Sequence, residues 1–356
     1  MKKNTVNNLI TYGIVVVGYI IFTVMGATGN LSSSMKGYLV PMCIYIIMAV
    51  SLNLVVGILG ELSLGHAGFM CAGAYCSAIF SKCTQDIITI APLRFVLAIL
   101  VGAAAAAIFG VLIGIPVLRL RGDYLAIVTL AFGEIIKNIV NVIYLGIDSN
   151  GVHFSTESAM ALGLEADGQI IIKGAQGISG TPQDANFTAG AILVLLSLFI
   201  VLNLIHSRDG RAIMSIRDNR IAAESIGINI TKYKLMVFTI SAALAGAAGA
   251  LYSHNFATLT SAGDKFNYNA SIMILVYVVL GGMGSVRGSM IAAIILYILP
   301  EKLRFLNDYR MLVYAIVLII VMLFNWSPKA INLKQAVIAK VKGKFGRKEA
   351  ALNEHA

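Results

Sequence analysis

Polar side chains that could take part in chemistry interrupt two long apolar runs of this sequence. The first interruption, GELSLGHAGF, spans Gly60–Phe69 and contains Glu61, Ser63 and His66. An imidazole there could relay protons, bind a metal ion or contact a transported solute. No second histidine or cysteine stands at metal-ligand spacing from His66, so we expect no metal site. The remaining interpretations are a hydrogen-bonded structural histidine and one that contacts solute.

The second interruption is an acid–base pair. Glu134 and Lys137 stand near the middle of the run Tyr124–Leu145, with Asn138 and Asn141 beside them. A separation of three residues places the two charges on one face of a helix. Ionised groups within a membrane are costly and by default indicate function. An ion pair can also neutralise itself against a neighbouring helix, so both structural pairing and the lining of a polar path are consistent with the pattern.

The elements that position these groups are predicted to be membrane helices. Of 356 residues, 58% are hydrophobic and 12% are charged, and the mean hydropathy is +0.84. Soluble domains carry about twice that share of charge, so we predict an all-α, polytopic integral membrane bundle. The four cysteines fit neither a disulfide framework nor a zinc site. The excess of 27 basic over 17 acidic residues is more typical of cytoplasmic loops and anionic lipid than of nucleic-acid binding.

Ten apolar runs are candidates to cross the membrane, which takes about 20 residues of helix. They are Leu9–Ala27, Tyr38–Leu59, Leu62–Phe80, Leu93–Leu118, Tyr124–Leu145, Phe187–Ile205, Leu235–Tyr252, Ala270–Met283, Ser289–Pro300 and Met311–Trp326. Ala270–Met283 and Ser289–Pro300 are short and flank the glycine-rich LGGMGSVRGS. They are candidates for broken or re-entrant helices, which need shielding by protein. The expected count is therefore about ten spans, within a range of eight to ten.

Charge predicts the orientation of the bundle. With ten spans both termini lie in the cytoplasm, and eighteen lysines and arginines then fall in cytoplasmic segments against eight in outer segments. This bias agrees with the positive-inside rule. The Lys-Lys start before an apolar run also resembles a signal peptide, but a retained span preserves the even count.

Three polar segments complete the predicted organisation. Gly146–Asn186 is acidic and rich in turn residues, and we expect it outside; Ser207–Lys234 is basic, and we expect it in the cytosol. The tail from Lys329 to Arg347 spaces cations among apolar residues, as in segments at a membrane surface, although a disordered tail fits it too. We predict a transmembrane domain at 1–328, with an outer loop at 146–186 and a cytosolic loop at 207–234. A basic cytoplasmic tail follows at 329–356.

Enzymatic motifs do not occur in the sequence. There is no GxxxxGK[ST] phosphate loop, no HExxH and no GxSxG. No soluble stretch is long enough for an ATPase domain. These absences predict a transporter rather than an enzyme, with no cofactor bound by this chain.

The cytosolic loop is predicted to contain a short helix. In RDNRIAAESIGINITKYK, Asn219 can cap the helix Ile221–Ile226, and Gly227 can adopt the positive φ that ends it. An ordinary basic loop is one interpretation. The spacing of Ala222 and Ala223 before Gly227 also matches the inner part of the EAAxxxG motif of ABC-importer permeases, in which a short helix docks into an ATPase. Ile221 replaces the leading glutamate of that motif.

Glycine-rich stretches indicate close packing. The run Ala242–Tyr252 carries Gly246 and Gly249 among alanines, and small residues at this density let helices approach closely. The stretch VVLGGMGSVRGSMIAAIILY is also loosely similar to the region that begins at Gly60. A parallel repeat would place both glycine-rich breaks at one membrane level.

Five segments together carry a family resemblance. They are SLNLVVGILGELSLGHAGFMCAGAY, GDYLAIVTLAFGEIIKNIV, GISGTP, RDNRIAAESIGINITKYKLMVFTISAALAGAAGALY and VLGGMGSVRGSMIAA. Their order and spacing resemble the M-type permease subunit of branched-chain amino-acid ABC importers, from about Tyr38 to Pro300. The resemblance implies a multi-pass protein of a prokaryotic inner membrane. The implied partners are a related H-type permease, two cytoplasmic ATPases that bind the ATP, and an extracytoplasmic binding protein.

The resemblance also implies a cargo and a mechanism. Family members carry leucine, isoleucine and valine, and related permeases carry urea, short amides or other amino acids. Transport would proceed by alternating access along a path near Asn53, Ser63, Gly65, His66, Gly68 and Glu134. Closure of the ATPases would act on Arg217, Arg220, Ala222, Ala223, Glu224 and Gly227. For the charged residues of that second set, a solvated surface is an equally good interpretation.

Two other transporter classes remain as alternatives. A secondary transporter driven by an ion gradient would need a membrane carboxylate, for which Glu134 is the candidate. A channel is the third class, but no repeated pore-loop signature indicates one. Uptake that requires ATP and a binding protein, and that persists when ion gradients are collapsed, would identify an ABC importer. It would exclude both of these alternatives.

Overall fold

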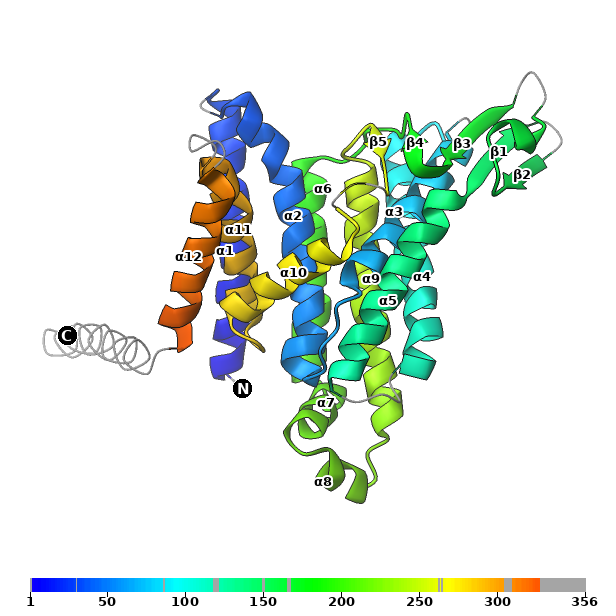
Figure 1. Cartoon of the computed structure of the whole chain (residues 1–356). Coiled ribbons are helices and arrows are strands. Elements are labelled where there is room, and N and C mark those ends of the chain that lie inside the picture. The colour runs from blue at the N-terminus through cyan, green and yellow to red at the C-terminus, as the bar shows by residue number, and fades with distance from the viewer. Residues whose placement is uncertain are drawn as a thin grey trace, which may run out of the picture. The chain divides into compact units, whose positions relative to one another are not determined.

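The structure is a computed structural model that describes residues 2–29, 31–85, 87–117, 122–148, 151–164, 168–261, 263, 265–303 and 309–326 (Figure 1). The basic tail at 329–356 therefore lies outside the described residues. The chain divides into two compact units, Met1–Tyr297 and Ile298–Ala356. The first unit contains all the candidate site residues.

Helices make up most of the described residues of both units. The first unit contains α1 (Lys2–Ala27), α2 (Ser33–Asn53), a π-helix (Leu54–Leu59), α3 (His66–Cys83), α4 (Ala91–Val117), α5 (Asp123–Val142), α6 (Phe187–His206), α7 (Arg208–Asp218), α8 (Arg220–Ser225), α9 (Ile230–Ser253), α10 (Tyr268–Gly281) and most of α11 (Val286–Lys302). The second unit contains the end of α11 and α12 (Arg310–Trp326).

Six helices in the described part of the chain are long and apolar enough to cross a membrane. They are α1 from Asn8, α2 with the π-helix, α4, α5, α6 and α9. This number confirms a polytopic helical bundle. The other predicted spans correspond to α3, α10, α11 and α12, which are shorter or less apolar; α10, for example, has 14 residues.

Short strands correct the all-α prediction. The segment after α5 forms an antiparallel sheet of β1 (Tyr144–Asp148), β2 (Gly151–Ser155) and β3 (Gln169–Lys173) in the order β2-β1-β3, and β4 (Ile178–Ser179) pairs with β5 (Thr258–Leu259). Two 3₁₀ turns, Met160–Leu162 and Gly174–Gln176, lie in the same segment. Asp148 pairs with Gly151, and the Asn-Gly pair at 150–151 is a strong hairpin signal. The predicted span Tyr124–Leu145 was therefore too long, because the helix ends at Val142.

The two loops of the first unit lie at opposite ends of its helices. Figure 1 shows the start of α1 and the arm formed by α7 and α8 at one end, and the β-strands at the other. Asn219 caps α8 by accepting a hydrogen bond from Ala222 N at 3.1 Å, and Gly227 has a φ of +85°. The predicted short helix and its Asn219 cap are confirmed, but the helix spans Arg220–Ser225 rather than Ile221–Ile226, with Ile226 at its C-cap and Gly227 directly after it.

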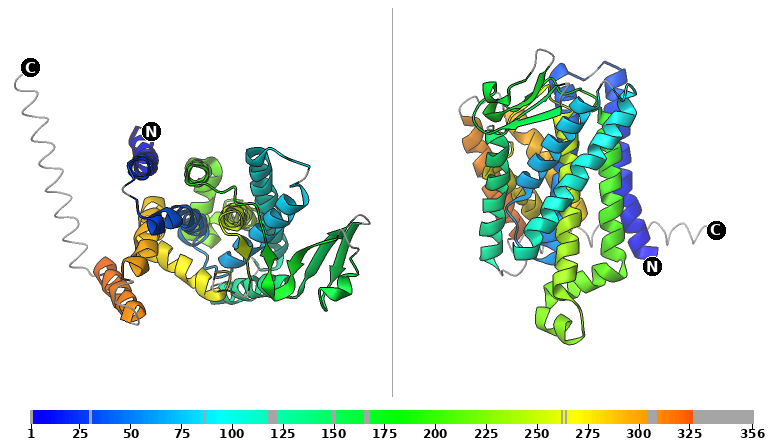
Figure 2. Two further views of the ribbon diagram at one scale, coloured as in Figure 1. Left: turned by 90° about the horizontal axis from the view of Figure 1, so that it is seen from above. Right: turned by 90° about the vertical axis from the view of Figure 1, so that its right-hand side faces the viewer.

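Small residues hold the core of the first unit together. Of the most apolar 18 residues of α2 and the π-helix after it, 94% are buried. Helix α9 packs closely against α3 and α4 (Figure 2). A β-carbon on Gly73 would lie 2.3 Å from the Cα of Gly246, and one on Gly249 would lie 2.1 Å from the Met70 oxygen. The predicted packing role of Gly246 and Gly249 is confirmed.

Two breaks interrupt the helical pattern. The third span was predicted to begin at Leu62, but residues 60–65 are not helical and α3 begins at His66. Gly60 turns the chain with a φ of +81°, and the backbone N–H of Leu64 bonds to the side chain of Thr129 instead of continuing a helix. The second break, at residues 282–285, separates α10 from α11, as the glycine-rich sequence predicted.

Candidate functional site

The break at 282–285 packs against the end of α2 and the π-helix that follows it. Asn53 is fully buried, and its Oδ1 accepts a hydrogen bond from the backbone N–H of Gly284 at 2.9 Å. A β-carbon on Gly57 would lie 2.2 Å from that same nitrogen. The break at 282–285 therefore packs against a helix that ends directly before the first break. The Nδ2 of Asn53 is buried and finds no hydrogen-bond partner among the described residues.

Helix α7 contacts the same junction through Arg217. Its Nη1 donates to the Gly57 carbonyl at 3.1 Å, and its Nε and Nη2 donate to Asp218. A β-carbon on Gly60 would lie 2.6 Å from the Cγ of Arg217. The sequence suggested Arg217 as a contact for an ATPase; in the structure part of its guanidinium group faces the bundle.

A buried ion pair lies beside this junction. The carboxylate of Glu61 binds the ammonium group of Lys234 in the first turns of α9. The Lys234 side chain is 2% exposed and that of Glu61 is 17% exposed. Sequence reasoning missed this pair, because the partners are 173 residues apart in the chain. The one sequence signal for Glu61 was that it interrupts a long apolar run.

The non-helical segment 60–65 packs against α5. The N–H of Leu64 donates to Thr129 Oγ1 at 3.0 Å, and a β-carbon on Gly65 would lie 2.2 Å from the Thr129 oxygen. A β-carbon on Gly68, at the start of α3, would lie 2.5 Å from the Cα of Gly133. Ser63 is 1% exposed, and its hydroxyl has no hydrogen-bond partner in the described part of the chain.

His66 is hydrogen-bonded inside the bundle. Its Nε2 lies 2.7 Å from the hydroxyl of Ser51, and the residue is 2% exposed. Ser241 in turn donates to the Ser51 carbonyl at 2.6 Å. These contacts fit the structural interpretation of His66. Among the described residues, no group of three or more His, Cys, Asp or Glu side chains could hold a metal ion.

Glu134 makes the predicted pair and one further contact. Its Oε2 lies 3.2 Å from the Nζ of Lys137, and its Oε1 accepts a hydrogen bond from the backbone N–H of Tyr268 at 2.8 Å. Tyr268 is the first residue of α10, so the carboxylate binds a free N–H at a helix N-terminus. Glu134 therefore attaches one end of α10 to α5, while Gly284 attaches the following break to Asn53.

The tip of the α7–α8 arm presents apolar side chains to solvent. Ile221 is 80% exposed and Ile226 is 74% exposed. Ala223 is buried against Ile216 and Ile230, so α8 packs against α7 and the start of α9. The other predicted coupling residues differ in exposure: Ala222, Glu224 and Gly227 are exposed, and Arg220 is half-buried.

A second cluster lies at the opposite end of the helices. Arg94 at the start of α4 binds Asp184 at 2.8 Å. His254, directly after α9, is fully buried, and its ring contacts that of Phe95 with a centroid distance of 5.1 Å. Its Nε2 has no hydrogen-bond partner among the described residues. Burial lowers the pKa of His254, and the cation of Arg94 adds to this shift against the opposing effects of the Ala250 carbonyl and Asp184.

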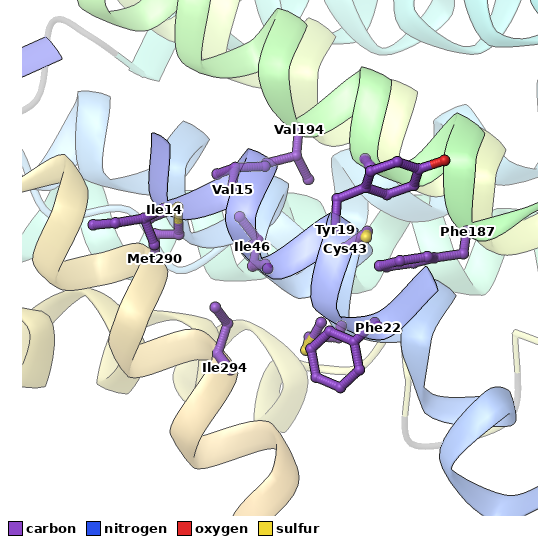
Figure 3. A pocket seen from close by; sticks show the side chains of 13 residues that line it. Ile14, Val15, Tyr19, Phe22, Cys43, Ile46, Phe187, Val194, Met290 and Ile294 are labelled. Carbon is purple, nitrogen blue, oxygen red and sulfur yellow. The ribbon is translucent and has the colours of Figure 1, made fainter. Parts of the chain in front are cut away.

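A small pocket lies between α1, α2, α6 and α11. Figure 3 shows Tyr19 and Phe22 of α1, Ile46 of α2, Phe187 of α6 and Met290 of α11 around it. Its lining is aliphatic, aromatic or sulfur-containing. Such a lining offers no charged partner for a zwitterionic solute, so we do not place the transport path there.

Comparisons with known proteins agree with this architecture. A family described as "Branched-chain amino acid transport system / permease component" matches residues 34–322. The high-affinity branched-chain amino acid transport system permease protein LivM of Salmonella typhimurium is 38% identical over 299 residues, which cover 81% of this chain and 67% of that protein. LivM of Escherichia coli is 36% identical over 298 residues, with the same coverage. The ribose import permease protein RbsC of E. coli is 31% identical over 142 residues, 37% of this chain and 43% of that protein. No solved structure matches significantly.

Proposed function

Since the chain belongs to the family of permease components of branched-chain amino-acid ABC transport systems, we propose that it lines the path along which leucine, isoleucine or valine crosses the membrane. It is a multi-pass protein of the bacterial inner membrane and a transporter subunit rather than an enzyme. The family typically binds no cofactor of its own.

The proposed topology has about ten spans, with α3, α10, α11 and α12 added to the six long apolar helices, and with both termini in the cytoplasm. The separation of the α7–α8 arm from the β-strands along the helices supports it, because the arm is basic and the strand segment is acidic. The transmembrane domain would then extend over 1–328, with the tail 329–356 in the cytoplasm.

The proposed assembly contains a related H-type permease, two cytoplasmic ATPases that bind ATP, and an extracytoplasmic binding protein. The exposed Ile221 and Ile226 on the arm support docking to an ATPase, because an apolar tip can fill a groove on a partner. Ala222 and Gly227 let the partner approach closely, and Arg220 and Glu224 would supply polar contacts at the rim.

The contact between Arg217 and Gly57 is the observation that carries the proposed mechanism. It joins the arm to Gly57, which lies against Gly284 of the second break and shortly before the first break. An ATPase that moves the arm would move the ends of both breaks, and thereby open one side of the path and close the other. Asn53, Ser63, Gly65, His66, Gly68 and Glu134 would lie along this path. A secondary transporter that uses Glu134 is less well supported, because that carboxylate already holds Lys137 and the start of α10.

Reconstituted uptake tests this function. The assembled complex in proteoliposomes should accumulate labelled leucine only with ATP inside and the binding protein outside, and ionophores that collapse ion gradients should not abolish uptake. Uptake by this chain alone, driven by an ion gradient, would contradict the proposal. Competition by unlabelled isoleucine, valine, urea and short amides defines the cargo.

A further inference from the structure

The chain enters the α7–α8 arm through α7 and leaves it into α9, and both of these helices contact the π-helix Leu54–Leu59. Helix α7 follows α6 directly, and α9 begins at Ile230, after α8. The two helices also pack against each other. Figure 1 shows α7 at the end of α2, where the π-helix lies. Both ends of the arm therefore contact one short element of the bundle.

Each end of the arm holds the chain near Gly60 through a charged side chain. Arg217 of α7 donates to the carbonyl of Gly57, which precedes Gly60. Lys234 of α9 binds the carboxylate of Glu61, directly after Gly60. Gly60 turns the chain between these two contacts with a φ of +81°. Arg217 therefore holds the chain before the turn, and Lys234 holds it after the turn.

The non-helical segment 60–65 connects α9 to α5 and α3. Near its start Glu61 binds Lys234. Near its end the N–H of Leu64 donates to Thr129 Oγ1 in α5 at 3.0 Å, and α3 begins at His66. A shift of the start of α9 relative to α5 would therefore pull on this segment and on the first turn of α3.

Stability does not account for the Glu61–Lys234 pair. Lys234 is 1% exposed, and the cost of removing two charges from water offsets much of their attraction, so apolar side chains of similar volume are often as stable. The pair does provide direction. Hydrophobic contacts are non-directional, so two surfaces can slide along each other, whereas a charge-assisted hydrogen bond has a preferred distance and angle. An ion pair is therefore better suited than apolar packing to transmit a movement.

We propose that Glu61 and Lys234 are positioning residues for transport, and that their ion pair transmits the movement of the arm to segment 60–65 and thereby to α3. This inference rests on the proposed function, in which an ATPase moves the arm. The contact of Arg217 with Gly57 then acts on the chain before the Gly60 turn. The ion pair acts on the chain after that turn, so the two contacts are separate connections.

A comparison of transport with stability tests this role. The assembled complex is reconstituted with its binding protein, and leucine uptake per ATP hydrolysed is measured beside the unfolding temperature. The double variant Glu61→Gln/Lys234→Met removes both charges and leaves side chains of similar length. We expect it to unfold near the wild-type temperature but to lose about fivefold or more of its uptake per ATP, which is a typical size for coupling between sites. Wild-type uptake per ATP in this variant overturns the inference.

A second variant decides the matter if the double variant does not assemble. Glu61→Gln alone keeps an oxygen that can accept from Lys234 and removes only the negative charge. We expect uptake per ATP to fall about fivefold in the assembled complex. Normal uptake per ATP overturns the inference.

The ion pair of Arg94 with Asp184 provides the matched control. Its side chains are 8% and 17% exposed, against 2% and 17% for Lys234 and Glu61, but it lies at the end of the helices away from the arm. Arg94→Met/Asp184→Asn should leave uptake per ATP unchanged. An equal loss in both double variants overturns the inference, because any buried ion pair would then have the same effect.

Failure of the proposed function gives a different result. Leucine uptake by the wild-type complex that needs an ion gradient and no ATP contradicts the function, and the inference with it. Hydrogen exchange at the amides of 60–65, compared between the ATP-free and the vanadate-trapped complex, follows the movement without any cargo. We expect a change in wild type that Glu61→Gln/Lys234→Met loses. The same change in that variant overturns the inference and leaves the function standing.

Discussion

Arg217 in α7 donates a hydrogen bond to the carbonyl of Gly57 in the π-helix that follows α2. The two residues are 160 positions apart, and the bond fixes the α7–α8 arm to a residue that lies against Gly284 of the break at 282–285 and shortly before the non-helical segment 60–65. A movement of the arm therefore acts on this junction through the side chain of Arg217 as well as through the continuous chain.

Replacing Arg217 should uncouple the arm from the breaks. Arg217→Ala removes a bond from a charged donor and leaves the Gly57 carbonyl without that partner. Coupling free energies between sites are typically 1–3 kcal/mol, so uptake should fall about fivefold or more, while the complex assembles and still hydrolyses ATP. Exposed Arg211, on the same helix, is the matched control: Arg211→Ala should transport normally. Equal loss in both variants would indicate a general charge effect.

Breaking the Glu61–Lys234 pair should be worse than removing it. Either Lys234→Met or Glu61→Gln alone leaves the other charged group poorly hydrated and without its partner. Breaking a fully buried pair in this way lowers the free energy of unfolding by about 3–5 kcal/mol, and the loss is smaller here because Glu61 is 17% exposed. The double variant leaves no unpaired charge and should recover much of the lost thermal stability. Unfolding temperatures of the four proteins in detergent check this. Additive losses would show that the pair contributes little.

Sequence predicted those features that local chemistry decides. The apolar runs predicted the main helices, and Asn219 and Gly227 predicted the start and the end of the short helix α8. The i,i+3 spacing of Glu134 and Lys137 placed that ion pair, because three residues make almost one helical turn.

Features that depend on distant partners were missed. Residues 62–65 carry an apolar pattern that suits a helix, but the hydrogen bond from Leu64 to Thr129 comes from a residue 65 positions away. The contact of Glu134 with Tyr268 and the pair of Glu61 with Lys234 are of the same kind. The strands after α5 did have a local signal, the Asn-Gly pair at 150–151, which the membrane pattern before it obscured.

Gly68 should not tolerate a side chain. A β-carbon there would lie 2.5 Å from the Cα of Gly133, a backbone atom that cannot move aside cheaply. Overpacking of this kind costs about 1–3 kcal/mol or more, so Gly68→Ala should lower the yield of folded protein and its unfolding temperature. Gly13→Ala in α1 is the matched control, because nothing lies within 4 Å of its β-carbon position. A normal yield for Gly68→Ala would show that α3 and α5 can separate.

Acid should destabilise the protein through His254, directly after α9. Burial lowers its pKa in the folded protein, so below about pH 6.5, the ordinary value, an unfolded chain binds a proton that the folded chain resists. Stability from this group is therefore retained at higher pH and lost as the pH falls. His254→Phe keeps an aromatic ring against Phe95 and removes the titration, so its unfolding temperature should fall less between pH 7.5 and 5.5. An unchanged pH dependence would assign the acid lability to other groups, such as Asp184.

Substitutions of Glu134 can separate its two roles. Glu134→Gln keeps an oxygen that can accept the Tyr268 N–H but removes the charge that pairs with Lys137. Glu134→Ala removes both. If the carboxylate mainly anchors α10, the glutamine variant should keep most of its transport and the alanine variant should lose it, because the start of α10 is then unbound. If the charge itself lines the path, both variants should lose transport equally. Uptake of labelled leucine by complexes of equal assembly distinguishes these outcomes, and we expect the first.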